Sequence, residues 1–253
     1  MSHFVFDHKR VYYRESGAGQ PLLFLHGNTA SSNMYASIAD KYAQDYRVIL
    51  IDFLGHGQSD RLPEFPADLW FYEARQVIAF LQLRQYTDVR IIASSGGAIV
   101  ALNAALEAPE LVAKVIADSF EGESPHRIFT ENLLADRARA KADPAAREFY
   151  AWMHGRDWEQ IVDQDTAAVI RHAKELGSFF HRPLDTLKAD ILLTGSKKDE
   201  FMTAVSDLYL ERTYQDMIRK IGHGRIHLFD SGAHPAMITN QDEFYRISMD
   251  FLR

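Results

Sequence analysis

Short apolar runs that end in Gly, Asp or Ser alternate with longer amphipathic segments along most of this 253-residue chain. Runs of the first kind are typical of buried strands, and the segments between them have the apolar spacing of helices. Repeated alternation of strands and helices indicates a mostly parallel sheet that helices cover on both faces. The sequence therefore predicts a doubly wound α/β fold.

The expected elements follow from the same pattern. Strands are predicted at 10–16, 21–27, 46–52, 89–94, 113–119, 190–196 and 224–230, and helices near 31–44, 69–86, 96–107, 203–220 and 241–252.

The alternation lapses between residues 121 and 183, where the chain is rich in Ala, Arg, Glu and aromatic residues and has helical spacing. This segment is too short and too poor in strands for an independent domain. We therefore predict a core domain of residues 1–120 and 184–253, and a helical cap of residues 121–183 laid over one end of the sheet.

The cap contains the stretch "FYAWMHGRDW", which could line an apolar pocket or form the core of the cap itself. Helical spacing favours the second role for most of its large side chains. These are Phe149, Tyr150, Trp152, Met153 and Trp158.

The composition excludes several classes of function. Asp and Glu number 35 against 28 Lys and Arg, and the formal net charge of −7 argues against a broad surface for nucleic acid or anionic membrane. The absence of cysteine excludes disulfides, thiolate nucleophiles and Cys-based zinc sites. The start of the sequence has no signal-peptide pattern, and no apolar stretch approaches the length of a membrane span, so we expect a cytoplasmic protein.

The stretch "IIASSGGAIV", residues 91–100, joins a predicted strand directly to a predicted helix. A serine nucleophile on such a sharp turn needs small residues two positions before and two positions after it. Ser95 meets this requirement with Ala93 and Gly97, whereas Ser94 would place a branched isoleucine at the crowded position. We therefore expect Ser95 to be the nucleophile, the alternative being a Ser-Gly turn that merely starts a helix.

Two backbone N–H groups near this turn are candidates for an oxyanion hole. "LLFLHGN" ends a predicted strand at its Asn28, where the chain turns away and can point an N–H above the sheet. The N–H of Gly96 lies just after Ser95 at a helix start, where the helix dipole favours negative charge.

A further glycine-rich stretch, "IDFLGHGQSD", also follows a predicted strand. It lacks the spacing of a P-loop or of a dinucleotide-binding loop. We interpret it as a tight structural turn, with His56 as a loop residue.

The motifs "LHGN", "DFLGHGQSD", "ASSGGAIVALNAALEAPELV", "LLTGSKKDEF" and "SGAHPAMI" occur in the order and spacing of the α/β-hydrolase superfamily. The chain is most similar to its small, Ser-dependent, helical-capped branch of carboxylesterases, lactonases and carbon–carbon bond hydrolases. The Pro109–Glu110 pair has the distance from Ser95 that relatives show. The resemblance implies an α/β-hydrolase fold whose cap is inserted after the sixth strand.

In this superfamily the nucleophile, the acid and the base follow in the order Ser, Asp or Glu, His. The resemblance implies His234 as the base, because relatives carry it in the loop before the final helix. The competitors His223 and His227 have i, i+4 spacing, but the surrounding glycines and the strand character of "GRIHLFD" favour a structural role for both.

The resemblance also implies Asp199 as the acid. Relatives usually place it in a G-x-x-D loop after the strand that follows the cap, and this chain has one extra residue there, Lys197 or Lys198. Asp118, at the end of an earlier strand, matches a location that a minority of the superfamily uses and stays open as an alternative. Asp230 has the position of a turn former.

The resemblance thus implies a serine hydrolase that attacks a small carboxylic ester or lactone through an acyl-enzyme, without a metal or an organic cofactor. A small-molecule ester-like substrate is the expected partner, and neither nucleic acid nor a membrane is expected. Carbon–carbon hydrolysis, lyase chemistry, cofactor-free peroxidation and low-turnover ligand binding stay open on the same fold. The sequence does not indicate the oligomeric state.

Overall fold

The computed structural model describes residues 2–253 and contains one eight-stranded sheet in the order β1-β2-β4-β3-β5-β6-β7-β8. The strands are β1 (Ser2–Phe6), β2 (Lys9–Ser16), β3 (Pro21–Leu25), β4 (Arg47–Ile51), β5 (Val89–Ser94), β6 (Val112–Asp118), β7 (Asp190–Ser196) and β8 (Arg225–Phe229). From β4 to β8 along the sheet all neighbours are parallel, and β1 and β2 are antiparallel additions at one edge. The predicted mostly parallel sheet is confirmed.

Strand β1 was not predicted. It is an edge strand that pairs only with β2, and its Val5 is 67% exposed. Because it is half exposed and mixes polar with apolar side chains, it lacks the continuous apolar run that marks the buried strands.

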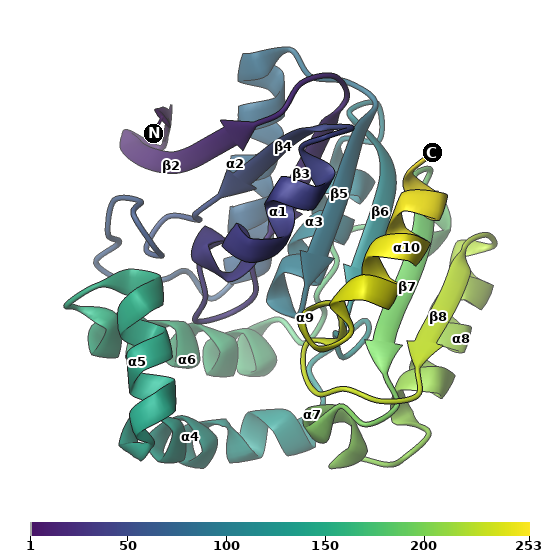
Figure 1. Cartoon of the computed structure of the whole chain (residues 1–253). Helices are drawn as coiled ribbons and strands as arrows, with labels where there is room; N and C mark the ends of the chain where they lie inside the picture. The colour runs from purple at the N-terminus through teal and green to yellow at the C-terminus, as the bar shows by residue number, and fades with distance from the viewer. Residues whose placement is uncertain (1) are drawn as a thin grey trace.

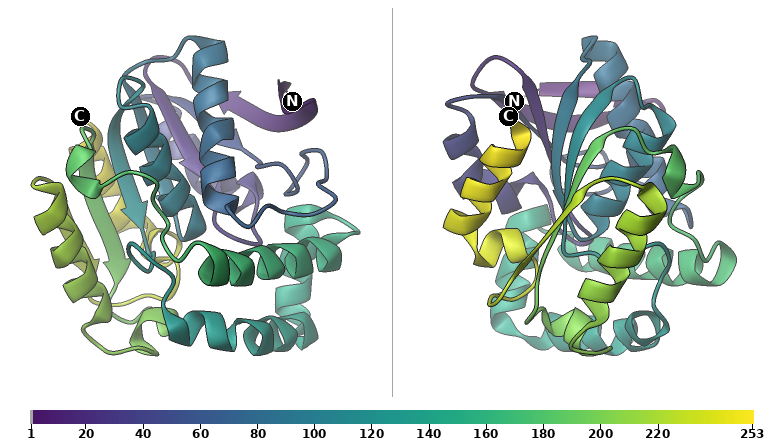
Figure 2. Two further views of the ribbon diagram at one scale, coloured as in Figure 1. Left: turned by 180° about the vertical axis from the view of Figure 1, so that it is seen from behind. Right: turned by 90° about the vertical axis from the view of Figure 1, so that its right-hand side faces the viewer.

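Helices cover both faces of the sheet, as predicted (Figures 1 and 2). The helices of the two layers are α1 (Ala36–Tyr42), α2 (Leu69–Arg84), α3 (Gly96–Glu107), α8 (Tyr209–Ile221), α9 (Ala236–Thr239) and α10 (Gln241–Leu252), with short 3-10 turns η1 (Ser32–Tyr35) and η2 (Leu184–Thr186). Along β3, Leu23 and Leu25 pack into the cluster that includes α2, α3 and α8, while Leu22 and Phe24 pack into the cluster with α1 and α10. Successive side chains of the strand thus point to opposite faces of the sheet and pack into two separate cores.

The helix predicted at 203–220 is shorter in the structure and starts later. One turn, α7 (Glu200–Thr203), is followed by a break, and α8 starts only at Tyr209. The buried face of α8 begins with Leu210 and continues at helical spacing through Tyr214 and Met217, whereas residues 203–208 supply no such face. Without apolar positions to bury, that stretch has little to hold it in a helix.

Three helices lie within residues 121–183, the segment predicted as a cap: α4 (Arg127–Ala142), α5 (Pro144–His154) and α6 (Trp158–Glu175). We call them the cap helices. They follow β6 in the chain and lie across the carboxyl ends of the parallel strands, at the bottom of Figure 1. Among residues 2–253, no helix has the length and apolar content needed to cross a bilayer.

Candidate active site

Ser95 occupies the turn between β5 and α3 and has φ 55° and ψ −129°. Few residues with a side chain adopt a positive φ, and such strain concentrates at functional sites. The turn is tied to the sheet because the Ser95 N–H donates to the carbonyl oxygen of Asp118 on the next strand, at 2.8 Å. Ser95 is partly exposed and faces a cavity.

The neighbours of this turn are as small as the sequence motif requires. A Cβ atom at Gly97 would overlap the Leu25 and His26 carbonyl oxygens, and a Cβ atom at Gly27 would lie 2.9 Å from the Cβ of Ser95. Ala93 is fully buried at the end of β5. The turn therefore packs directly against the end of β3, which leaves no room for larger side chains.

Ser94 has a different environment. It is fully buried at the end of β5, and its hydroxyl is 2.8 Å from the Tyr35 hydroxyl. Both serines border the cavity, but they differ in exposure: Ser95 is partly exposed, whereas Ser94 is fully buried and its hydroxyl is paired with that of Tyr35.

His234 and Asp199 come together from two loops at the carboxyl ends of β8 and β7. The Asp199 Oδ2 atom accepts a hydrogen bond from the His234 Nδ1 atom at 2.8 Å. Asp199 is fully buried and also caps α7, because its Oδ1 accepts the N–H groups of Phe201 and Met202. These bonds fix the orientation of the carboxylate. Because the carboxylate binds Nδ1 of His234, the other ring nitrogen, Nε2, remains free to accept a proton.

The surroundings of His234 favour its protonated form. Burial alone would lower the pKa of the imidazole, but the hydrogen bond and the charge of Asp199 outweigh it, with smaller contributions from Asp118 and Glu200. The pKa of His234 therefore lies above its ordinary value of 6.5. Glu200 also accepts the backbone N–H of His234 at 3.1 Å.

Asp118, the alternative acid, points elsewhere. Its Oδ1 accepts from the Thr194 hydroxyl at 2.8 Å and its Oδ2 accepts from the Met237 N–H at 3.0 Å. Burial raises the pKa of Asp118 to about 7, against these hydrogen bonds. Of the two candidates, Asp199 contacts the imidazole of His234 and Asp118 joins β6 to β7 and to the start of α9.

The remaining candidates from the sequence lie outside this cluster. The His223 Nε2 atom is 3.0 Å from the Ala189 carbonyl oxygen, and His227 lies on β8 with its ring against Phe229. Asp230 is exposed and pairs with Lys197 at 2.6 Å.

Asn28 and Gly96, the two residues expected to form an oxyanion hole, both line the cavity. Within the described chain, neither the Asn28 N–H nor the Gly96 N–H donates to another group. The Asn28 side chain lies against the turn, since a Cβ atom at Gly96 would overlap its Oδ1. Both donors therefore lie beside Ser95, at the end of β3 and the start of α3.

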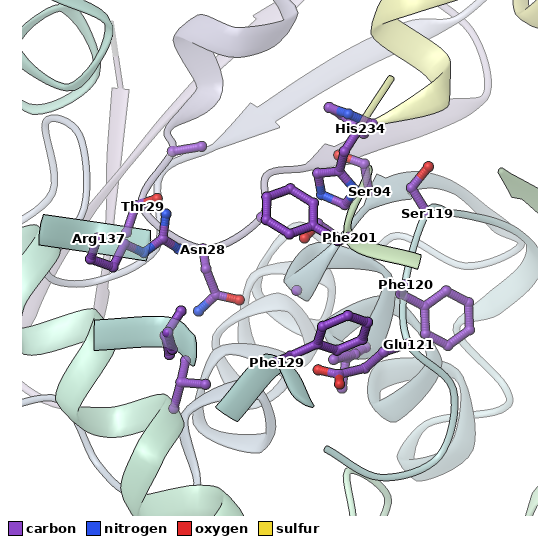
Figure 3. Close-up of a pocket in the computed structure, with 18 of the residues that line it drawn as sticks. Asn28, Thr29, Ser94, Ser119, Phe120, Glu121, Phe129, Arg137, Phe201 and His234 are labelled. Carbon is purple, nitrogen blue, oxygen red and sulfur yellow. The ribbon is translucent and has the colours of Figure 1, made fainter. Parts of the chain in front are cut away.

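The cavity beside Ser95 has a volume of about 340 Å³ and lies between the sheet and the cap helices (Figure 3). In that view Phe120, Phe129 and Glu121 gather on one side, and Asn28 and Arg137 on the other. Ser95, His234 and the two backbone donors all line it. Burial raises the pKa of Glu121 to about 7, although the His126 N–H donates to its carboxylate.

The large cap side chains divide between the two roles considered for them. Phe149 and Tyr150 line the cavity. Tyr150 also stacks on Trp158 inside the cap, Met153 is buried against the Ser31 hydroxyl, and Trp152 is 55% exposed. Tyr150 and Trp158 thus belong to the core of the cap, and Phe149 and Tyr150 line the cavity.

A buried polar cluster beside the cavity was not predicted. His56, interpreted from the sequence as a loop residue, is 1% exposed and lies 3.3 Å from Asp165 of α6 and 3.7 Å from Glu73 of α2. Burial, together with the nearby Asp165, raises the pKa of Glu73 well above its ordinary value. One signal was available: Asp165 falls at helical spacing from Ile161 and Val162, on the apolar face of its helix.

Comparison with known proteins finds relatives among hydrolases. The chain is 25% identical to 2-hydroxy-6-oxo-6-phenylhexa-2,4-dienoate hydrolase of Comamonas testosteroni, with 96% of this chain and 91% of that protein covered. It is 24% identical to the serine hydrolase BPHL of Mus musculus over 96% of this chain and 83% of that protein.

A solved esterase from Exiguobacterium antarcticum superposes with a TM-score of 0.75 at 20% identity, covering 97% of this chain and 96% of the esterase. The model of the family described as "Alpha/beta hydrolase family" matches residues 22–247. This match runs from the second residue of β3 through β8 and includes all the candidate site residues. The chain belongs to the alpha/beta hydrolase family.

Proposed function

We propose that this protein is a serine hydrolase that cleaves a small carboxylic ester or lactone through an acyl-enzyme. The observation that carries the proposal is the placement of Ser95. Ser95, on its strained turn, and His234, which is paired with Asp199, line one cavity. Asn28 and Gly96 line it as well, and their backbone N–H groups donate to no group of the described chain. A nucleophile, a base, an orienting acid and oxyanion donors are the parts that acyl transfer needs.

In the proposed reaction, the Ser95 hydroxyl attacks the carbonyl carbon while its proton passes to the Nε2 atom of His234. Asp199 holds the imidazole through Nδ1 and stabilises the positive charge that forms on it. The N–H groups of Asn28 and Gly96 donate to the carbonyl oxygen as it becomes negative. The alkoxide then leaves with the proton from His234, and the acyl group stays on Ser95.

Water completes the cycle. His234 takes a proton from a water molecule, the resulting hydroxide attacks the acyl-enzyme, and the acid leaves as Ser95 recovers its proton. The walls of the cavity are mainly apolar, with Phe120, Phe129 and Phe149 among them, which favours a substrate with a hydrophobic acyl or alcohol group.

Hydrolysis of a carbon–carbon bond is the second candidate, and Arg137 favours it. Arg137 lines the cavity, and its Nη1 donates to the Tyr150 hydroxyl at 3.2 Å. Its Nε is buried without a hydrogen-bond partner, and within residues 2–253 the guanidinium forms no ion pair at 4.0 Å or less. A half-buried cation in a cavity wall suits a substrate that carries a carboxylate. The dienoate hydrolase of Comamonas testosteroni is named for such a substrate.

Turnover of two substrate types tests the proposal. We expect the wild-type protein to hydrolyse short p-nitrophenyl esters, with a burst of about one nitrophenolate per chain for esters whose deacylation is slower than their acylation. Ser95→Ala should lose turnover by a factor on the order of 10⁶. Faster cleavage of a 6-oxo-dienoate than of the esters would favour the second candidate. Ester turnover that survives Ser95→Ala would contradict both.

A further inference from the structure

Asp165 is a carboxylate of the cap that lies fully buried next to the candidate oxyanion loop. Its Oδ2 atom accepts three hydrogen bonds: from the Asn28 side-chain amide at 3.0 Å, from the Thr29 N–H at 3.2 Å and from His56 at 3.3 Å. It forms no ion pair with a Lys or Arg of residues 2–253. A carboxylate buried this way costs several kcal/mol of desolvation unless hydrogen bonds compensate for it. Two of the three donors that compensate belong to the loop that supplies the Asn28 N–H.

A second cap residue holds the same loop from the other side. The Nε2 atom of His154, at the end of α5, donates to the Thr29 carbonyl oxygen at 3.0 Å. Its Nδ1 accepts the Gly57 N–H at 3.2 Å, which fixes this tautomer. Burial and the nearby His56 lower the pKa of His154 to about 3, so it stays neutral. Both sides of the Thr29 residue are therefore bonded to cap side chains.

Thr29 needs such support because its φ is 55°. A β-branched residue is strained in the left-handed region, and strain of this kind persists only where surrounding contacts impose it. A local rotation that relieved the strain at Thr29 would also turn the preceding peptide groups, including the N–H of Asn28.

The Asn28 side chain is fixed as well. Its amide nitrogen donates to Asp165, while its Oδ1 accepts from the Trp70 indole at 3.1 Å and lies against Gly96. The side chain is thus held between the cap, α2 and the turn that carries Ser95. Figure 3 shows Asn28 and Thr29 together on one side of the cavity.

From these contacts we infer that Asp165 is a positioning residue: through Asn28 and Thr29, helix α6 of the cap aligns the Asn28 N–H with the oxyanion that forms on the substrate. This inference rests on the proposed function. It differs from a purely structural role, in which Asp165 would only anchor the cap and so affect all ligands of the cavity alike.

A pair of ketone inhibitors separates the two roles. A trifluoromethyl ketone accepts the Ser95 oxygen at its carbonyl carbon while the Ser95 proton moves to His234, and its own oxygen becomes a hemiketal oxyanion in the hole. The methyl ketone with the same alkyl chain occupies the cavity without forming this adduct to a comparable extent. The ratio of the two inhibition constants therefore reports on alignment of the oxyanion donors.

Three variants test Asp165. Asp165→Ala removes all three hydrogen bonds. It should raise the inhibition constant of the trifluoromethyl ketone about 10- to 100-fold and that of the methyl ketone less than about threefold. Asp165→Asn should keep the ratio of the two inhibition constants close to that of the wild type. The Oδ1 atom of Asp165 has no partner, so an amide can keep its oxygen at the Oδ2 position. Asp163→Asn, on the exposed face of the same helix, is the matched control and should change neither constant.

If thermal unfolding shows that Asp165→Ala does not fold, Asp165→Ser replaces it, since the smaller polar side chain leaves room for water at His56. An unchanged ratio in a folded Ala or Ser variant, or equal weakening of both ketones, would overturn the inference while leaving the proposed function intact. A wild-type protein that binds the two ketones equally would overturn both.

Discussion

At the scale of single residues, the strained backbone conformation of Ser95 links the sequence motif of the turn to the proposed role of its hydroxyl. A positive φ in a non-glycine residue costs about 1–3 kcal/mol, which the neighbouring packing must supply. Here the bond from the Ser95 N–H to Asp118 and the close approach of Gly27 and Gly97 impose the turn. The strain leaves the hydroxyl exposed at the cavity and the Gly96 N–H free.

The roles of the two acids can be separated by substitution. Asp199→Asn should lower kcat by a factor on the order of 10³–10⁴, because the amide favours the wrong imidazole tautomer. Asp118→Asn should mainly destabilise the fold, by about 1–3 kcal/mol, since it disturbs the bonds to Thr194 and Met237. Steady-state kinetics and urea unfolding of both variants provide the measurement. If kcat stayed near normal in Asp199→Asn and fell by several powers of ten in Asp118→Asn, the assignment of the acid would be reversed.

The pH dependence of kcat/KM should follow the ionisation of His234. Only the neutral imidazole can accept the Ser95 proton, so activity is lost as pH falls through the pKa of His234. Because that pKa is raised, the midpoint of the acid limb should lie above 6.5. Glu200→Gln keeps an acceptor for the His234 N–H but removes a negative charge, and it should move the midpoint to lower pH. A midpoint that moves upward, or not at all, would contradict this.

At the scale of elements, the strands and helices that bury a continuous apolar face were predictable from the sequence alone. β3, β5 and α3 lie close to their predicted bounds because their side chains are almost entirely buried. The edge strand β1 and the break before α8 were missed, since each depends on which positions the tertiary fold leaves exposed.

The close contact of α3 with β3 gives an element-scale prediction. In Gly97→Ala the added methyl group would overlap the backbone of Leu25 and His26, which cannot move without shifting β3. We expect a loss of about 1–3 kcal/mol in the free energy of unfolding. Urea denaturation with an unchanged m-value would show this loss, and a variant as stable as the wild type would refute the packing described for the turn.

Helix α5 offers a matched pair of aromatic residues. Phe149 lines the cavity, whereas Trp152 is more exposed and does not line it. Phe149→Ala should raise KM for aryl esters about fivefold, the loss of roughly 1 kcal/mol of apolar contact, with little change in kcat. Trp152→Ala should leave both constants near wild type. Equal effects of the two substitutions would show that the cap acts on substrate only through its stability.

At the scale of the whole molecule, residues of the sheet's loops and of the cap helices line the same cavity. The serine turn and the loops of Asp199 and His234 follow local motifs, and so the sequence predicted them. The contacts of Asp165 with Asn28 and Thr29 span 137 and 136 residues, and no local pattern encodes such a pairing. The candidate triad was therefore predictable, whereas the support that the cap gives to the oxyanion loop required the three-dimensional structure.

The most direct measurement of the central claim is the position of a covalent label. Wild-type protein is treated with a small fluorophosphonate, its intact mass is measured, and the modified peptide is mapped. One phosphonyl group per chain is predicted on Ser95, absent in Ser95→Ala and retained in Ser94→Ala. A label on Ser94, or labelling that survives Ser95→Ala, would contradict the proposed active site.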